Sequence, residues 1–121
     1  MTDLLLELLN NAYTEIDYLC FSCVVEMNNG ELFKGVNVKN SVFRDSIYAE
    51  QLAIAQAITA GYKKGDFKSL HLMVGSNDFN EFRYLSEETI KEFFDDEDEI
   101  FLYNLKGEVK KIKVKNLGFK F

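Results

Sequence analysis

The sequence contains no proline, and its seven glycines are dispersed along 121 residues. Linkers and low-complexity tracts are typically rich in proline, glycine or serine, and neither these tracts nor internal repeats are visible here. The length and an apolar fraction of 47% fit one compact domain with a substantial core. We therefore expect a single domain over residues 1–121.

The chain also lacks the patterns of membrane and secreted proteins. No apolar run approaches the roughly 18 residues that a membrane-spanning helix needs. The first residues lack the basic start and the small-residue cleavage site of a signal peptide, so we expect a cytoplasmic protein with no membrane partner. The formal net charge of −6 repels phosphate backbones, which makes nucleic acid a poor partner.

Cysteine and histidine, the most common zinc ligands, are limited to Cys20, Cys23 and His71. Residues 19–25 have the pattern of a strand, on which residues three apart point to opposite faces, so the two thiols should neither chelate one ion nor form a disulfide. His71 lies in the apolar segment 70–74, where we expect a core or interface histidine rather than a metal ligand. Soft ligands alone therefore cannot build a tetrahedral zinc site here.

An acidic run, Asp95 to Glu99, has two interpretations. Runs of one charge sign usually form a solvated loop that keeps a protein soluble, and we favour this interpretation. The other interpretation is a patch for a cation or a basic partner.

Hydrophobic periodicity predicts three helices and five strands. Thr2 or Asp3 should cap the first helix and Ser86 the third, because their side-chain oxygens accept hydrogen bonds from free backbone N–H groups. Asn28-Asn29-Gly30 favours a hairpin between the first two strands, and Gly61 should end the second helix. The helices are expected at 2–15, 47–60 and 86–94, and the strands at 19–27, 31–38, 67–74, 100–104 and 108–114.

This order of elements, α-β-β-α-β-α-β-β, predicts an α/β fold with one mixed five-stranded sheet and helices on both faces. The hairpin makes one antiparallel pair, and the helical crossovers favour parallel neighbours after it. Four lysines in or next to the last strand suit a sheet edge, since charge discourages pairing with another chain. They are Lys110, Lys111, Lys113 and Lys115.

Two stretches resemble a known family. Residues 35–40 read Gly-Val-Asn-Val-Lys-Asn, and residues 48–54 read Tyr-Ala-Glu-Gln-Leu-Ala-Ile. They resemble the small homo-oligomeric cytidine deaminases, in which a strand ends G-x-N-x-E-N and the next helix opens C-A-E-R, with P-C-x-x-C at a later helix. An Asn-Gly hairpin, an Ala-Tyr pair after the first helix and a late Asn-Leu-x-Gly turn at 104–107 extend the resemblance along the chain. It implies a cytidine-deaminase-like three-layer fold.

The resemblance also locates the positions of the zinc ligands. Zinc deaminases hold the metal with a His or Cys plus two Cys, and the metal generates hydroxide near neutral pH. The corresponding positions here are Tyr48, Arg83 and Ser86. Arginine does not deprotonate in proteins, and a neutral serine hydroxyl is a poor zinc ligand. Gln51 replaces the family's arginine, which resembles a counter-charge for the thiolates, so we expect no metal and no other cofactor.

The substrate side is altered as well. Asn37 matches an asparagine that contacts the ribose hydroxyl in the family, whereas Lys39 reverses the charge of the family's neighbouring glutamate. Leu19 takes the place of an aromatic residue near the base. Asn37, Asn40 and Ala49 are retained and could hold the geometry between loop and helix rather than a ligand.

Glu50 matches the glutamate that moves a proton between the zinc-bound water, the ring and the leaving amine. It is either a retained general acid/base or a first-turn carboxylate that stabilises the helix by about 0.3–1 kcal/mol. A lone buried carboxylate is costly, so we expect Arg83 or Arg44 to pair with it. We also expect Tyr48 to fill the volume that a metal would have occupied.

These patterns predict a zinc-free, catalytically inactive cytidine deaminase-like protein. It would bind a pyrimidine nucleoside or serve as a subunit, either of a homo-oligomer (a dimer or a tetramer) or of an assembly with an active relative. Several aromatic side chains are compatible with a subunit interface, although core burial explains most of them equally. They are Phe43, Tyr48, Phe79, Phe82, Tyr84, Phe93, Phe119 and Phe121.

Two other hypotheses stay open. The first is an active cytidine or nucleoside deaminase, a hydrolase with an altered site in which Glu50 acts with Tyr48 or Asp45, with or without a hard metal. Without zinc the pKa of water stays far from neutral, which disfavours this mechanism. The second is a fold that persists without a function.

Overall fold

The protein is described by a computed structural model that covers residues 1–14 and 19–118. Residues 15–18 and 119–121 and the side chains of Arg83 and Tyr84 lie outside the described part. Within that part, no helix combines the length and the apolar character that a membrane crossing requires.

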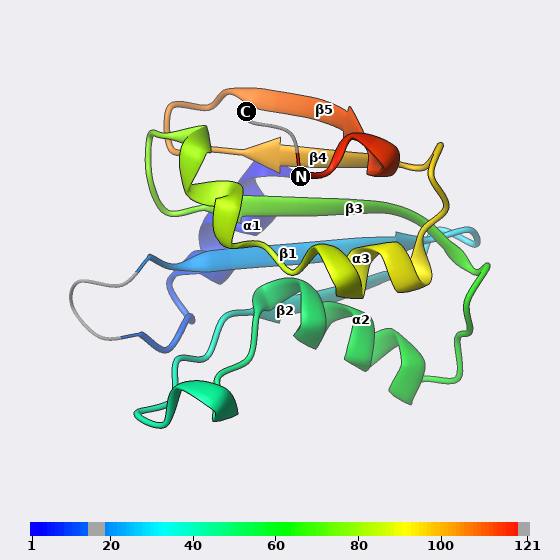
Figure 1. Ribbon diagram of the computed structural model, residues 1–121, viewed down its shortest axis with the longest axis horizontal. Coiled ribbons are helices and arrows are strands. Elements are labelled where there is room, and N and C mark those ends of the chain that lie inside the picture. The colour runs from blue at the N-terminus through cyan, green and yellow to red at the C-terminus, as the bar shows by residue number, and fades with distance from the viewer. Residues whose placement is uncertain (15–18, 119–121) are drawn as a thin grey trace.

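A single five-stranded sheet forms the middle layer of the fold, in the order β2-β1-β3-β4-β5 (Figure 1). All predicted helices and strands are present, most with bounds within two residues of those expected. The elements are α1 (Thr2–Leu9), β1 (Phe21–Met27), β2 (Leu32–Val36), α2 (Ala49–Thr59), β3 (Phe67–Val74), α3 (Glu87–Phe93), β4 (Glu99–Tyr103) and β5 (Val109–Lys113), with short 3-10 helices η1 (Phe43–Asp45), η2 (Phe79–Tyr84) and η3 (Val114–Asn116).

The sheet is mixed, as predicted. β1 pairs antiparallel with β2 and with β3, β3 pairs parallel with β4, and β4 pairs antiparallel with β5. The prediction that helical crossovers join parallel neighbours is confirmed for β3 and β4 and wrong for β2 and β3, which are not neighbours. The α2 crossover returns β3 parallel to β2 but on the far side of β1, so β1 separates the two.

Helices cover both faces of the sheet, which confirms the predicted layers: α1 lies behind it and α2 and α3 lie in front (Figure 1). Strand β1, which lies between β2 and β3, is buried on both faces for this reason. Cys23 points toward the α2 side and Val24 toward the α1 side, where Val24 meets Leu5. Both cysteines are free, as expected.

Helix α1 is shorter than predicted. It ends at Leu9 rather than near residue 15, its N-cap is Met1 rather than Thr2 or Asp3, and no side chain caps it. Beyond it, Tyr13 is extended: its N–H donates to Asn37 O (3.0 Å) and its carbonyl accepts from Lys39 N–H (2.6 Å). These long-range hydrogen bonds replace those of a further helical turn.

Strand β2 and helix α2 touch at Gly35. A Cβ on this residue would lie 2.4 Å from Ala49 O and 2.5 Å from Ala53 N, both backbone atoms. Only glycine permits this approach, so the first residue of the Gly-x-Asn stretch sets how closely α2 packs on the sheet.

His71 is a satisfied core histidine, as predicted. Its Nδ1 lies 2.8 Å from Tyr103 Oη and its Nε2 lies 3.2 Å from Ser69 Oγ. The ring stacks on Phe101 with centroids 4.7 Å apart. Burial lowers the pKa of His71, and the nearby Glu26 carboxylate opposes this effect.

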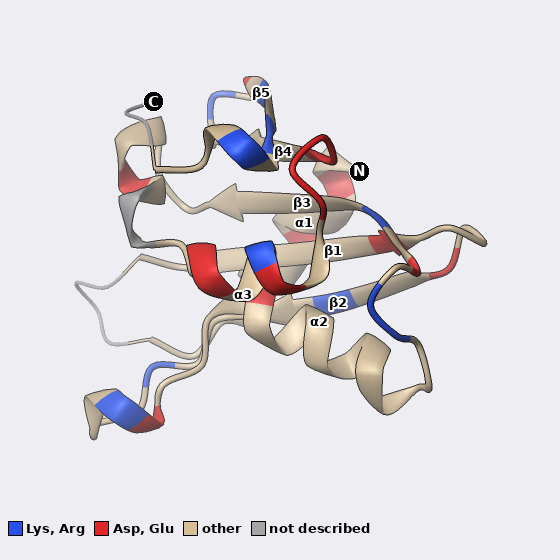
Figure 2. Ribbon diagram, turned by 45° about the vertical axis from the view of Figure 1, so that its right-hand side comes forward, with Lys and Arg blue, Asp and Glu red and all other residues tan. Residues whose placement is uncertain are grey.

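The acidic run is more than a solvated loop, because it pairs with the basic edge of the sheet (Figure 2). Glu97 contacts Lys113 at 2.6 Å and Lys115 at 2.7 Å, and Glu99 contacts Lys111 at 3.1 Å. Hydrogen bonds from Lys113 and Lys115 lower the pKa of Glu97 to about 2. The run therefore faces a basic partner within its own chain.

Candidate functional site

A cavity of about 780 Å³ opens where β1 begins, β2 ends and α2 begins. Its walls are largely apolar and aromatic, with a few polar and charged groups, a combination typical of small-molecule sites. The lining residues are Leu19, Phe21, Asn37, Val38, Lys39, Phe43, Arg44, Ser46, Ile47, Tyr48, Gln51 and Glu81.

One wall of the cavity is the loop that carries η1. Val38 and Ile47 close its base by exchanging two backbone hydrogen bonds of 2.9 Å. Asn40 holds the loop itself: its Oδ1 accepts from Val42 N–H (3.1 Å) and its own N–H donates to Ser46 Oγ (2.9 Å). Asn40 therefore holds the loop geometry, which was one of the two roles open to it.

Asn37 lines the cavity but is already bonded to β1. Its Oδ1 accepts from Phe21 N–H (2.8 Å) and its Nδ2 donates to Leu19 O (2.9 Å). These bonds fasten the end of β2 to the start of β1, so the structure gives Asn37 a structural role beside the predicted substrate contact. Lys39 also lines the cavity, and its Nζ lies 5.4 Å from the centroid of the Phe43 ring.

Tyr48 is the N-cap of α2, and its N–H donates to Gln51 Oε1 at 3.1 Å. Its side chain forms part of the cavity wall and is 40% exposed. Tyr48 therefore lies at the cavity surface, and its filling of the volume that a metal would have occupied stays a prediction. Phe82 is fully buried in the same core cluster as Ala49, and its ring meets that of Phe21 edge-on, with the ring centroids 6.2 Å apart.

Glu50 lies in the first turn of α2 and is only 2% exposed. Its Oε2 accepts a 2.7 Å hydrogen bond from Ser86 N–H. Burial raises its pKa, and the N–H groups of Ser86 and of Glu50 itself partly offset this rise. The predicted pair with Arg44 is wrong, since Arg44 is exposed in η1, and the side chain of Arg83 lies outside the described part.

Ser86 is the N-cap of α3, as predicted, but its hydroxyl makes no cap hydrogen bond. Its Oγ lies 2.8 Å from Thr89 Oγ1 instead. The starts of α2 and α3 thus meet through the Glu50–Ser86 hydrogen bond, and this brings together two of the three ligand positions that the resemblance implied. Arg83 belongs to η2, directly before this junction.

Cys23 is a neighbour of this junction that the sequence did not reveal. It is fully buried, and burial together with the Glu50 charge raises the pKa of its thiol well above the usual value. The thiol is therefore neutral. Side chains alternate between the two faces of strand β1, and this alternation places Cys23 on the face that α2 covers. That pattern is the sequence signal that could have located Cys23 near the junction. Among the described residues, no three His, Cys, Asp or Glu side chains form a group that could hold a metal ion.

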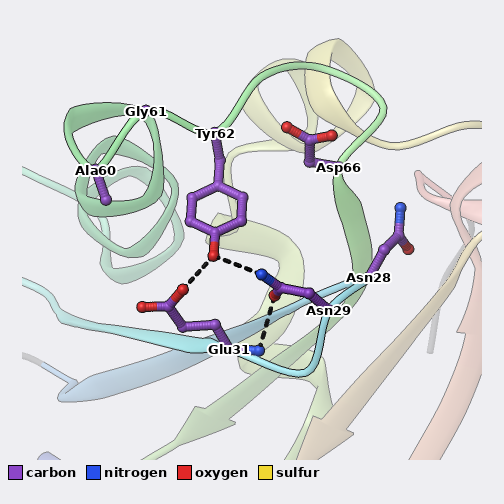
Figure 3. Close-up of a pocket in the computed structure, with 7 residues that line it drawn as sticks. All are labelled: Asn28, Asn29, Glu31, Ala60, Gly61, Tyr62 and Asp66. Atoms are coloured by element: carbon purple, nitrogen blue, oxygen red, sulfur yellow. Dashed lines mark hydrogen bonds between the residues drawn. The ribbon is translucent and has the colours of Figure 1, made fainter.

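A second hollow, of about 470 Å³, lies between the β1–β2 hairpin and the end of α2 (Figure 3). Its polar groups bond to one another: Tyr62 Oη accepts from Asn29 Nδ2 at 2.9 Å and donates to Glu31. The first cavity is larger and has apolar walls, so it is the better candidate for a ligand. The hollow is lined by Asn28, Asn29, Glu31, Ala60, Gly61, Tyr62 and Asp66.

No protein-family model matches the chain. A stretch of 60 residues is 37% identical to a cytidine deaminase of Mycoplasma genitalium; it covers 50% of this chain and 45% of that protein.

Solved structures extend the likeness to the whole fold. A cytidine deaminase from Burkholderia pseudomallei superposes with a TM-score of 0.76 at 22% identity, over 100% of this chain and 99% of that one. One from Mycobacterium leprae gives 0.66 at 19% identity, over 98% of each chain. The chain therefore has the α/β fold of these cytidine deaminases.

Proposed function

We propose that this chain is a zinc-free, catalytically inactive member of the cytidine deaminase family whose cavity binds a pyrimidine nucleoside. The observation that carries the proposal is the position of Glu50. Its carboxylate is buried on Ser86 N–H, and Glu50 is not among the residues that line the cavity. A general acid or base must come within hydrogen-bond reach of the reacting group, and a carboxylate that does not line the cavity and already accepts the Ser86 N–H is poorly placed for this.

The residues at the ligand positions do not fit a zinc ion. Tyr48 presents a phenol on the cavity wall, and the Ser86 hydroxyl is already bonded to Thr89. Cys23 is fully buried near Glu50, and one thiol cannot replace the two cysteines that zinc deaminases use. This donor set offers none of the soft anionic ligands that hold zinc in proteins.

The cavity suits a nucleoside without any catalytic group. Phe21, Phe43 and Tyr48 provide aromatic surface for a flat base, and aromatic stacking adds about 0.5–1.5 kcal/mol beyond area burial. Ser46 and Gln51 provide hydrogen-bonding groups for the base edge or the sugar. Its volume of about 780 Å³ lies within the usual range for small-molecule sites.

One observation favours the alternative, an active deaminase. A carboxyl group with a raised pKa is typical of a general acid or base, and burial raises the pKa of Glu50. The proposed helpers do not support it: Asp45 is exposed in η1 and does not line the cavity, and Tyr48 lies on its wall. Conversion of cytidine to uridine, lost in Glu50→Gln, would favour this alternative.

We also propose that the protein is a homo-oligomer. Tyr13 and Phe43, respectively 69% and 70% exposed, lie on adjoining segments around Lys39 and leave aromatic surface open beside the cavity. Sedimentation velocity of the purified protein should give a dimer or a tetramer, and a monomer at high micromolar concentration would refute this part of the proposal.

Isothermal titration with cytidine, uridine and adenosine tests the binding function. We expect saturable binding of the pyrimidine nucleosides, and about five- to tenfold weaker binding by Phe43→Ala, because Phe43 is an exposed lining residue that the fold does not need. Ile58→Ala is the matched control, since Ile58 is an exposed apolar residue in the last turn of α2, outside the cavity. Absence of binding by every nucleoside would refute the proposal.

A further inference from the structure

Among the described residues, those that line the cavity carry more positive than negative charge, on a chain whose formal net charge is −6. The charged ones among them are Lys39, Arg44 and Glu81. The apolar walls lie beside the two cations. A cavity of this kind fits a ligand that is flat and apolar at one end and anionic at the other.

Lys39 is positioned at the mouth rather than loosely extended. Its Nζ lies 5.4 Å from the centroid of the Phe43 ring, within the range of a cation–π contact. Phe43 directly precedes Arg44 in η1. Because Lys39 contacts the Phe43 ring, Lys39 and Arg44 lie on the same loop and line the same cavity. Figure 2 shows one blue band on η1 and another on the segment between β2 and η1.

Arg44 has no ion-pair partner within the described part of the chain. The ion pairs found there join Glu26, Glu87, Glu97 and Glu99 to lysines on α3, β3, β5 and η3. Asp45 adjoins Arg44 in sequence, but it does not line the cavity, and no ion pair joins the two. A guanidinium in this state offers its planar fork of N–H donors to a phosphate, which it can bind through two parallel hydrogen bonds.

We infer that the cavity takes a pyrimidine nucleoside monophosphate in preference to the free nucleoside, with Lys39 and Arg44 on the phosphate. This inference rests on the proposed function and specifies its substrate class. The aromatic walls hold the base, and the two cations neutralise a phosphate monoester that carries close to two negative charges at neutral pH. Glu81 lies on the same cavity and disfavours an anion near it, so the phosphate binds on the η1 side.

Isothermal titration at low ionic strength with cytidine 5′-monophosphate, cytidine, ribose 5-phosphate and inorganic phosphate tests the inference. We expect the nucleotide to bind about tenfold more tightly than cytidine, and this advantage to shrink as salt is added. Ribose 5-phosphate and inorganic phosphate should bind more weakly than the nucleotide, since neither has a base to stack.

Charge-removing variants locate the phosphate. Lys39→Gln and Arg44→Gln should each lower nucleotide affinity several-fold more than they lower cytidine affinity, because both residues line the cavity and only the nucleotide carries the phosphate. Lys64→Gln, an exposed lysine beyond the far end of α2, should change neither. Cytidine binding without a nucleotide advantage, or an advantage that survives both variants, overturns this inference and leaves the proposed function intact. Inorganic phosphate binding as tightly as the nucleotide also overturns it, and failure of every pyrimidine ligand to bind overturns both.

Discussion

The backbone N–H of Ser86 donates a 2.7 Å hydrogen bond to Oε2 of Glu50, and this bond joins the N-termini of two helices beneath the cavity. The resemblance linked this carboxylate to proton transfer, and the bond gives it a structural partner. The Glu50 side chain carries a charge and also accepts a hydrogen bond. Different substitutions can remove these two properties one at a time.

Glu50→Gln should keep the acceptor and remove the buried charge. Because burial raises the folded-state pKa of Glu50, its stabilising contribution is present in acid and is lost as pH rises through that pKa. At pH 8 the Gln variant should therefore be at least as stable as the wild type in urea unfolding. Glu50→Ala should lose about 1–3 kcal/mol, since it leaves Ser86 N–H unsatisfied. Equal losses in both variants would contradict this account of the contact.

His71 should make the protein less stable in mild acid. Burial lowers its folded-state pKa below the value of about 6.5 for an unfolded chain. A base with a lowered pKa contributes stability above the unfolded value and loses it as pH falls from that value through the folded-state pKa. The contribution of His71 to the free energy of unfolding should therefore decline below about pH 6.5, opposite in sign to that of Glu50. The chain has one histidine, so a proton NMR titration follows this imidazole without assignment. A midpoint at or above 6.5 would refute the prediction.

Gly35→Ala should destabilise the fold and shift α2. The added methyl would lie 2.4 Å from Ala49 O, and backbone atoms cannot move away without moving the helix. Overpacking of this kind costs about 1–3 kcal/mol, which thermal unfolding would detect. Gly75→Ala is a graded control, because its nearest atom, Cys20 O, is 3.2 Å away and calls for a smaller adjustment. An unchanged midpoint in Gly35→Ala would show that α2 does not depend on this contact.

Much of the fold could be predicted from the sequence, because periodicity and turn residues report local conformation. The strand at 67–74 and the hairpin turn at Gly30, whose φ of +89° suits glycine, are examples. The predictions that were wrong concern features that depend on residues far apart in the sequence. The last turn of α1 gives way to hydrogen bonds between Tyr13 and Lys39, and the pairing of β3 with β1 follows from where the α2 crossover ends.

The site was predictable in its positions and less so in its contacts. The motif at 48–54 located Glu50 and Tyr48 at the start of a helix, as found. It could not show that Ser86 would satisfy the carboxylate through a backbone N–H, because any residue but proline supplies that donor. The expected partner of the Glu50 carboxylate was therefore a charged residue such as Arg44, which is exposed instead.

The most direct measurement is the ultraviolet absorbance of cytidine incubated with the purified protein and stoichiometric zinc. The account predicts that cytidine stays unchanged over many hours, because neither the residues at the ligand positions nor Glu50 can activate a water molecule in the cavity. Uridine that accumulates over several turnovers, at a rate that depends on added metal and disappears in Glu50→Gln, would contradict it.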